Sequence, residues 1–348
     1  MSKICITTSC CNNGDVLAED IYNRVGVTLV HKNTVINEYI KYRLKSIGIC
    51  CVWIYDHLEL HEERLQDKRY TIIKNSYKST IMMVKKILLE LSSGRTIEYG
   101  EVDIIVNTIY DSINEKSAII QTLAEIKYAD VYTYTHCVNV ALYSMLIAKW
   151  LNFSEVTVKK VIVAGLLHDI GKIKVPIEIL NKKDKLSQKE FELIKRHSEY
   201  GYEMIKDRPE IDYNVSLGVR QHHERMDGSG YPDKLKGNDI GIYGRIVAVA
   251  DVYDAMTQNR VYKKGVTPFD AFEMFMTSGM QYFDLNVLSV FIKYLPVYFT
   301  EARVLLNNNV KGKIVYIPPT DILNPVVQAK TNFIDLSKEK QIKIVSIL

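Results

Sequence analysis

The chain has 348 residues, of which 47% are hydrophobic and 25% charged, and its formal net charge is only +4. This length predicts two or three domains with a core of normal size, and this charge gives no indication of binding to nucleic acid polymers. The most apolar stretch, VIVAGLL at residues 161–167, is far shorter than the ~20 residues of a membrane-spanning helix. The first residues show no basic start followed by an apolar run, so no secretory signal is expected. No membrane insertion is therefore expected, and the cytoplasm is the default location.

Residues 1–60 are predicted to form a small β-rich module of unknown role. The stretches DVLAEDIYN, GVTLVHKNTVI and ICCVWIY are short, rich in β-branched and aromatic residues, and separated by Gly or Asn turns. One helix near residues 37–46 is expected to interrupt them.

Six cysteines are consistent with a reducing compartment. Two adjacent pairs stand at residues 10–11 and 50–51, with Cys5 and Cys137 apart from them, and no C-x-x-C spacing occurs. We expect reduced thiols that pack as small apolar side chains. A thiolate metal site or redox sensor in the N-terminal module is the alternative.

Residues 61–128 are predicted to form a helical hairpin connector. A stretch of nearly thirty residues from about Glu62 lacks Pro and Gly and carries apolar residues at helical spacing. A turn at Ser93-Gly94 follows, and a second helical stretch is expected from about residue 102 to residue 128. A homodimer seam along these long helices is an alternative use of the apolar stripe.

The fold class predicted for the whole chain is mainly α, with β-rich parts at both ends. Residues 129–298 are expected to form a helical domain that carries the chemistry. Residues 299–348 are expected to form a β-rich appendage, because ARVLLNN, GKIVYI, PVVQAK, NFIDLS and IKIVSIL alternate in hydropathy between turn-forming segments.

The predicted helical domain contains five of the eight histidines, each of which alone is more often a structural residue. They are His136, His168, His197, His222 and His223. Neutral imidazoles together with carboxylates suit first-row metals such as iron, manganese or zinc. Asp169 adjoins one histidine, and Asp251 stands in an apolar helix where a carboxylate is expected to meet a cation. The set suffices for two metals, while Asp254 is expected to cap or pair on the surface and is left out.

The order of these residues resembles the HD-GYP branch of the HD phosphohydrolase superfamily. The motifs that carry the resemblance run from about residue 130 to residue 264: ADVYTYTH, HDIGK, HSEYG, HHERMDGSGYP and VADVYDAMT. The resemblance implies a helical HD-type domain that hydrolyses cyclic di-GMP to pGpG, with further cleavage to GMP left open. A catalytically weak cyclic-dinucleotide receptor and a hydrolase of another cyclic dinucleotide, such as 3',3'-cyclic GMP-AMP, are the alternatives.

The resemblance also implies a role for individual side chains. The implied metal ligands are His136, His168, Asp169, His197, His222, His223 and Asp251, with Asp169 bridging two divalent ions, iron or manganese. Lys172 would act on the scissile phosphate and hydroxide as a catalytic and substrate-binding residue, or else be a surface lysine at a helix end.

Three further side chains would contact the substrate. Arg260 and Lys263 would hold its phosphates, although as a bare basic cluster they would form a solvated face. Gly228 and Gly230 permit positive φ, and such a loop can bring Tyr231 to the pocket rim, where it holds substrate or packs on its own loop.

One departure from the family pattern concerns the number of metals. Members with three metals carry a glutamate four residues before the first histidine, where this chain has Tyr132. A phenol, with a pKa near 10, is a poor ligand at neutral pH. Two ions are therefore expected rather than three.

Overall fold

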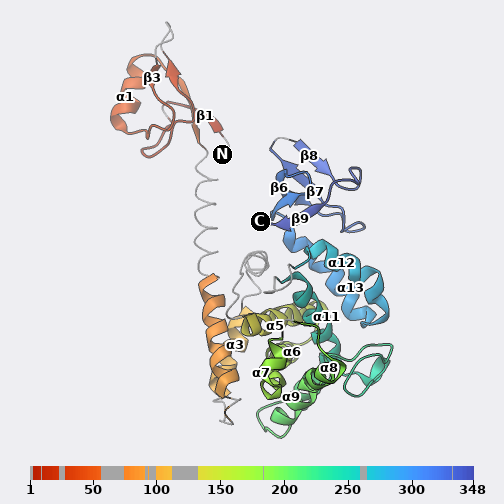
Figure 1. Cartoon of the computed structure of the whole chain (residues 1–348). Helices are drawn as coiled ribbons and strands as arrows, with labels where there is room; N and C mark the ends of the chain where they lie inside the picture. The colour runs from red at the N-terminus through yellow and green to blue at the C-terminus, as the bar shows by residue number, and fades with distance from the viewer. Residues whose placement is uncertain are drawn as a thin grey trace. The chain divides into compact units, whose positions relative to one another are not determined.

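A computed structural model describes residues 3–8, 10–22, 28–55, 74–90, 93, 99–111, 132–182, 184–258, 265–330 and 332–348. The chain divides into two compact units, Met1–Ile72 and Ile73–Leu348 (Figure 1). Within the described ranges, no helix combines the length and hydropathy required to cross a membrane.

The first unit is built from two small antiparallel strand pairs and one helix. β1 (Lys3–Thr7) pairs with β4 (Cys51–Tyr55), and β2 (Ile21–Tyr22) pairs with β3 (Thr28–Val30). The helix expected near residues 37–46 is α1 (Glu38–Ser46), and the Asn37 side chain caps it by accepting a hydrogen bond from the Ile40 amide. The β-rich character is confirmed, but β1 was not among the predicted strands.

The expectation that the cysteines are packed side chains is wrong for most of them. Cys11 and Cys137 are buried, whereas Cys5, Cys10, Cys50 and Cys51 are exposed. The reason on β4 is the period of two along a strand, which turns Val52 and Ile54 into the core and Cys51 outward.

Two helical segments open the second unit. Residues 74–90 are helical, and α3 spans Tyr99–Asp111. Lys86 of the first segment forms an ion pair with Glu101 of the second, and both segments contribute buried apolar side chains to the main core. The rest of the predicted hairpin, residues 61–73 and 112–128, and the turn residue Gly94 lie outside the described residues.

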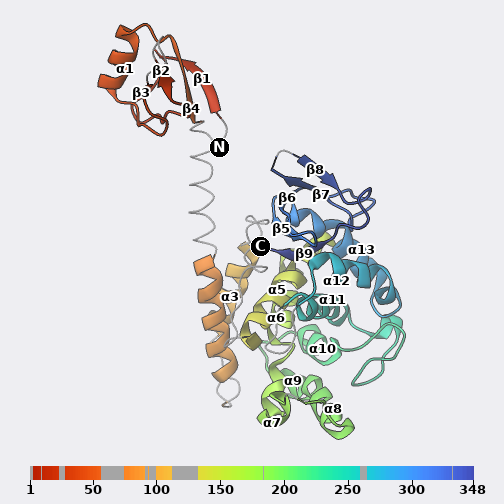
Figure 2. The ribbon, with the colours of Figure 1, turned by 45° about the horizontal axis from the view of Figure 1, so that its top comes forward.

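The described residues from 132 to 299 are mainly helical, as predicted. Their elements are α5 (Tyr132–Trp150), α6 (Glu155–Leu167), η2 (Ile170–Lys174), α7 (Ile177–Leu180), α8 (Gln188–Lys195), α9 (His197–Ile205), α10 (Tyr213–Gln221), η3 (Gly237–Asp239), α11 (Ile242–Thr257), α12 (Pro268–Met276), η4 (Ser278–Gln281), α13 (Leu285–Tyr294) and η5 (Pro296–Phe299). α5 packs against α6 and α11, and α10 packs against α9 and α11 (Figure 2). The mostly apolar α5, α6 and α11 form the centre of the core, as expected for helices buried on most sides.

The chain ends in a five-stranded antiparallel sheet. The strands are β5 (Arg303–Leu306), β6 (Lys311–Tyr316), β7 (Val326–Ala329), β8 (Asn332–Asp335) and β9 (Ile344–Ile347), in the order β8-β7-β6-β5-β9. The inward-facing Val304, Ile314 and Val327 join the same core cluster as the helices. The predicted fold class, mainly α with β-rich parts at both ends, is confirmed.

Candidate metal centre

Seven side chains from five parts of the helical unit converge on one buried cluster. His136 stands on α5, His168 and Asp169 follow α6, and Asp251 stands on α11. His197 begins α9, while His222 and His223 follow α10. The structure thus brings together all the residues that the sequence proposes as ligands, although they span more than a hundred positions of the chain.

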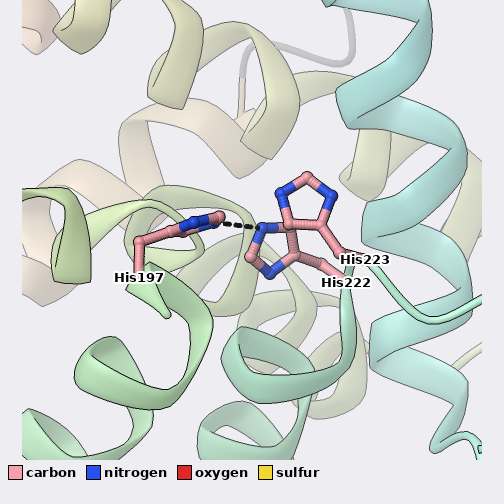
Figure 3. A group of neighbouring side chains, drawn as sticks. All are labelled: His197, His222 and His223. Carbon is pink, nitrogen blue, oxygen red and sulfur yellow. Dashed lines mark hydrogen bonds between the residues drawn. The ribbon is translucent and has the colours of Figure 1, made fainter. Parts of the chain in front are cut away.

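The cluster contains two groups that share no residue, each with donor atoms within 4.8 Å of one another, and a third group, His168, Asp169 and His222, overlaps both. In the first group, His136 Nε2 lies 3.1 Å from Asp251 Oδ1 and 3.3 Å from His168 Nε2. In the second group, His197 Nε2 lies 3.3 Å from His222 Nε2, and His223 completes the set (Figure 3). Either group has the size and the donor types of a metal site with room for water.

Asp169 lies between the two groups. Its Oδ2 atom is 3.3 Å from His168 Nε2 and 3.6 Å from His136 Nε2, while its Oδ1 atom is 3.5 Å from His197 Nε2. The two oxygens of one carboxylate therefore face different groups. This is the geometry that a bridging ligand requires.

Backbone carbonyls orient three of the imidazoles. The Nδ1–H groups of His168, His197 and His222 donate to the carbonyl oxygens three residues earlier, at 2.7–2.8 Å. Donation from Nδ1 leaves Nε2 without a proton and directs its lone pair into the cluster. Histidines that bind metals in proteins are commonly held in this way.

The expectation that Asp254 lies on the surface is wrong. Its side chain is only 1% exposed, its Oδ2 atom lies 2.6 Å from His136 Nδ1, and its Oδ1 atom accepts a hydrogen bond from Asn139. Asp254 therefore orients the imidazole of His136, the role that backbone carbonyls play for His168, His197 and His222. The signal was present in the sequence: Asp254 stands one helical turn after Asp251, so both carboxylates share a helix face.

The imidazoles of the cluster differ in pKa. Burial lowers the pKa of His197, His222 and His223, and these rings are therefore neutral, as metal ligands must be. His136 differs, because burial opposes protonation but hydrogen bonds with Asp251 and Asp254 raise its pKa to about 10. A metal ion that binds at His136 would therefore displace a proton from this ring.

The two carboxylates of the cluster remain ionised. Burial alone would raise the pKa of Asp169, but the Lys172 ammonium and the neighbouring histidines hold it well below the usual range. The pKa of Asp251 is likewise lowered against burial, chiefly by its hydrogen bond with His136. Ionised carboxylates beside neutral imidazoles are a donor set suited to divalent cations.

Lys172 lies inside the cluster rather than on a solvated helix end. It belongs to η2, and its Nζ atom is 2.5 Å from Asp169 Oδ2. About a third of its side chain remains exposed. The ammonium group therefore stands at the boundary between the buried carboxylate and solvent.

The DGSGYP loop closes one side of the cluster. The ring of Tyr231 packs 4.7 Å from the ring of His223, and burial raises the pKa of its phenol. Gly228 uses the positive φ that glycine permits, whereas Gly230 does not. Gly230 is required instead for close approach, because a Cβ atom there would lie 2.5 Å from the backbone of Glu224.

Glu224 is a second residue whose role was not foreseen. It is buried and accepts hydrogen bonds from the backbone amides of Asp233, at 2.7 Å, and Leu235, at 3.0 Å. It thereby ties the end of the loop to the residues that follow α10. Its position directly after the two adjacent histidines was the available signal.

Three predicted positions are not placed. Arg260 and Lys263 lie outside the described residues. Tyr132 is the first residue of α5, one turn before His136, and its side chain lies outside what the structure describes.

Comparison with known proteins identifies the class. The HD domain family matches residues 110–287, which is just over half of the chain. The chain therefore belongs to the HD domain family. The HHERMDGSGYP loop, built here around Gly230 and Glu224, places it in the HD-GYP branch of that family.

Individual relatives are similar over part of their length. The chain is 35% identical over 235 residues to the cyclic di-GMP phosphodiesterase PA4108 of Pseudomonas aeruginosa, covering 68% of this chain and 56% of that protein. It is 32% identical over 191 residues to a 3'3'-cGAMP-specific phosphodiesterase of Vibrio cholerae, covering 54% and 37%. The chain thus spans about half the length of the first relative and about a third of the length of the second.

One solved structure shares the fold of most of the chain. It is an HDG"Y"P protein from Bdellovibrio bacteriovorus, with a TM-score of 0.52 at 16% identity, and the match covers 84% of this chain and 99% of that one. At this identity the likeness concerns the fold alone.

Proposed function

We propose that this chain is a metal-dependent phosphodiesterase that opens cyclic di-GMP to linear pGpG, with catalysis in residues 129–298. The observation that carries the proposal is Asp169, whose two oxygens face two separate groups of imidazoles. A single carboxylate shared in this way is expected of a binuclear centre. The similarity to a cyclic di-GMP phosphodiesterase supports the same substrate class.

The donor set fits two divalent ions, iron or manganese. One ion would be held by His136, His168 and Asp251 and the other by His197, His222 and His223, with Asp169 between them. Imidazole and carboxylate without thiolate suit these metals. When bound, such a pair supplies Lewis acidity and a hydroxide nucleophile for attack at phosphorus.

The chain's own residues would position the substrate. Lys172, whose Nζ atom lies beside Asp169, is placed to donate hydrogen bonds to a phosphate oxygen at the reacting centre. Tyr231, packed on His223, would contact the substrate from the side of the loop. We assign the remaining phosphate contacts to Arg260 and Lys263.

A second substrate, 3',3'-cyclic GMP-AMP, is favoured by the similarity to a protein named for that specificity. Both dinucleotides carry the same phosphodiester ring and differ in one base, so the metal cluster does not discriminate between them. Turnover of both compounds, measured side by side, assigns the preference.

We also propose a homodimer through the helix of residues 74–90. Met82 and Leu89 are exposed there and stand two helical turns apart, on one face. Light scattering of the full chain is expected to give twice the monomer mass, and Met82→Glu with Leu89→Glu is expected to give the monomer. A monomeric unmodified chain would refute the dimer.

The function is tested with Asp169→Ala in the full chain, purified without oxygen. We expect loss of most bound metal and of detectable product from cyclic di-GMP, by metal analysis and product chromatography. Asp207→Ala, which changes an exposed aspartate after α9, is the control and is expected to behave as the unmodified chain. Full turnover by folded Asp169→Ala would refute the binuclear mechanism, and binding without turnover by the unmodified chain would favour a receptor.

A further inference from the structure

A buried series of hydrogen bonds connects the helix of residues 74–90 to the metal cluster. The Tyr77 hydroxyl donates to Asn139 Oδ1, and Asn139 Nδ2 donates to Asp254 Oδ1 at 2.7 Å. Asp254 Oδ2 lies 2.6 Å from Nδ1 of His136, whose Nε2 atom faces the cluster. All four side chains are buried, so solvent does not replace these contacts.

The helices that carry ligands also carry their supports. Asn139 follows His136 on α5 by three residues, and Asp254 follows Asp251 on α11 by three residues. Residues at this spacing share a helix face, so both helices present a ligand and a supporting side chain together. Tyr77 is the only contributor to this series from outside these two helices.

Each side chain of the series determines the hydrogen-bond orientation of the next. Asp254 Oδ1 accepts a hydrogen bond from the amide nitrogen of Asn139, which turns the amide oxygen toward Tyr77. The phenol can donate to that oxygen, so every hydrogen bond points toward Asp254. Removing the phenol oxygen would leave a buried amide oxygen without this donor, and the constraint on Asp254 would weaken.

We propose that Tyr77 is a positioning residue of the metal centre, acting through Asn139 and Asp254 on His136. The inference rests on the proposed metal site. The position of the helix of residues 74–90 then affects the metal affinity of the first group. This helix opens the second unit and carries no ligand, so a displacement of the helix is expected to change metal binding through Tyr77.

The test measures metal affinity of the full chain by Mn²⁺ titration against a competing chelator. Asp254→Asn is expected to weaken the first site about 10–100-fold, as loss of a partner to a metal-bound histidine does. Tyr77→Phe, which keeps the ring, is expected to weaken it about fivefold, the effect of one hydrogen bond. Tyr243→Phe is the matched control, since both tyrosines are 7% exposed and Tyr243 lies outside the series.

A double variant separates positioning from general destabilisation. If Tyr77 acts through Asp254, Tyr77→Phe has little further effect on affinity when Asp254→Asn is present. The absorption spectrum of bound Co²⁺ should change in both single variants and stay unchanged in Tyr243→Phe. Circular dichroism verifies that each variant is folded.

The outcomes are distinct. No Mn²⁺ binding by the unmodified chain would overturn the proposed function and this inference with it. Binding by the unmodified chain with unchanged affinity in folded Tyr77→Phe would overturn only the inference. Independent, additive losses in the double variant would also overturn it, because Tyr77 would then act by another route.

Discussion

Gly171→Ala is expected to disrupt the metal centre without changing a ligand. Gly171 follows Asp169 by two residues in η2, and a Cβ atom there would lie 1.9 Å from the carbonyl oxygen of His197. Ordinary contacts begin at 3.4 Å, so η2 and α9 would have to separate by about 1.5 Å. Asp169 Oδ1 and His197 Nε2 now lie 3.5 Å apart, and this separation would grow to about 5 Å.

That separation exceeds what one ion allows, because two ligands at about 2.1 Å from a common metal are at most about 4.2 Å apart. Overpacking of this kind costs about 1–3 kcal/mol of stability. A displacement on the order of 1 Å at a reacting centre lowers the rate about 100-fold. Gly171→Ala should therefore retain the fold while losing bound metal and turnover.

The assay combines metal content, thermal unfolding and turnover of cyclic di-GMP by the full chain. Gly100→Ala on α3 is the matched control, since a Cβ atom there meets nothing within 4 Å. It is expected to leave metal content and turnover unchanged and not to destabilise the fold. A folded Gly171→Ala protein with the metal content and turnover of the unmodified chain would contradict this prediction. It would show that metal binding does not require the close packing of η2 against α9.

Three further predictions concern the substrate, the metal count and the loop. Replacing Arg260 and Lys263 by Ala should raise KM by at least tenfold at unchanged metal content, since each charged contact contributes about 1.5–3 kcal/mol; an unchanged KM would return both to a solvated face. Metal analysis of the unmodified chain should give two ions per chain, and a third ion near Tyr132 would contradict the argument from its neutral phenol. Glu224→Ala removes the acceptor of two backbone amides. Glu224→Ala should lower the free energy of unfolding by about 1–3 kcal/mol. It should also raise KM with little loss of bound metal, and an unchanged melting temperature would refute this role.

Most of the candidate cluster could be predicted from the sequence because its residues stand in short local motifs. His168 and Asp169 directly follow α6, and His222 and His223 directly follow α10, so each pair enters the cluster from one helix end. Where a histidine follows the last turn of a helix, the carbonyl three residues earlier lies in that turn and is available to its Nδ1 atom. Local sequence therefore determines both the position and the orientation of these imidazoles.

Features that depend on distant contacts were not predictable in the same way. β1 is held by pairing with β4, almost fifty residues later, and its own short sequence gave too weak a signal. Cys5 and Cys51 are exposed because their side chains lie on the face of the strand pair that points away from the core. The pairing register determines which side chains lie on that face.

Asp254 shows where a residue-by-residue reading of a sequence is insufficient. Taken alone, an aspartate near the end of a helix is expected to lie on the surface, where its carboxylate stays hydrated. Taken with its helix, it follows a run in which Ile246, Val247, Val249 and Ala250 are all buried, so little of α11 faces solvent. A second carboxylate one turn after Asp251 is then costly to bury unless it has a partner. The partner is the imidazole of His136 on another helix, so the same burial that makes Asp254 costly makes its hydrogen bond to His136 strong.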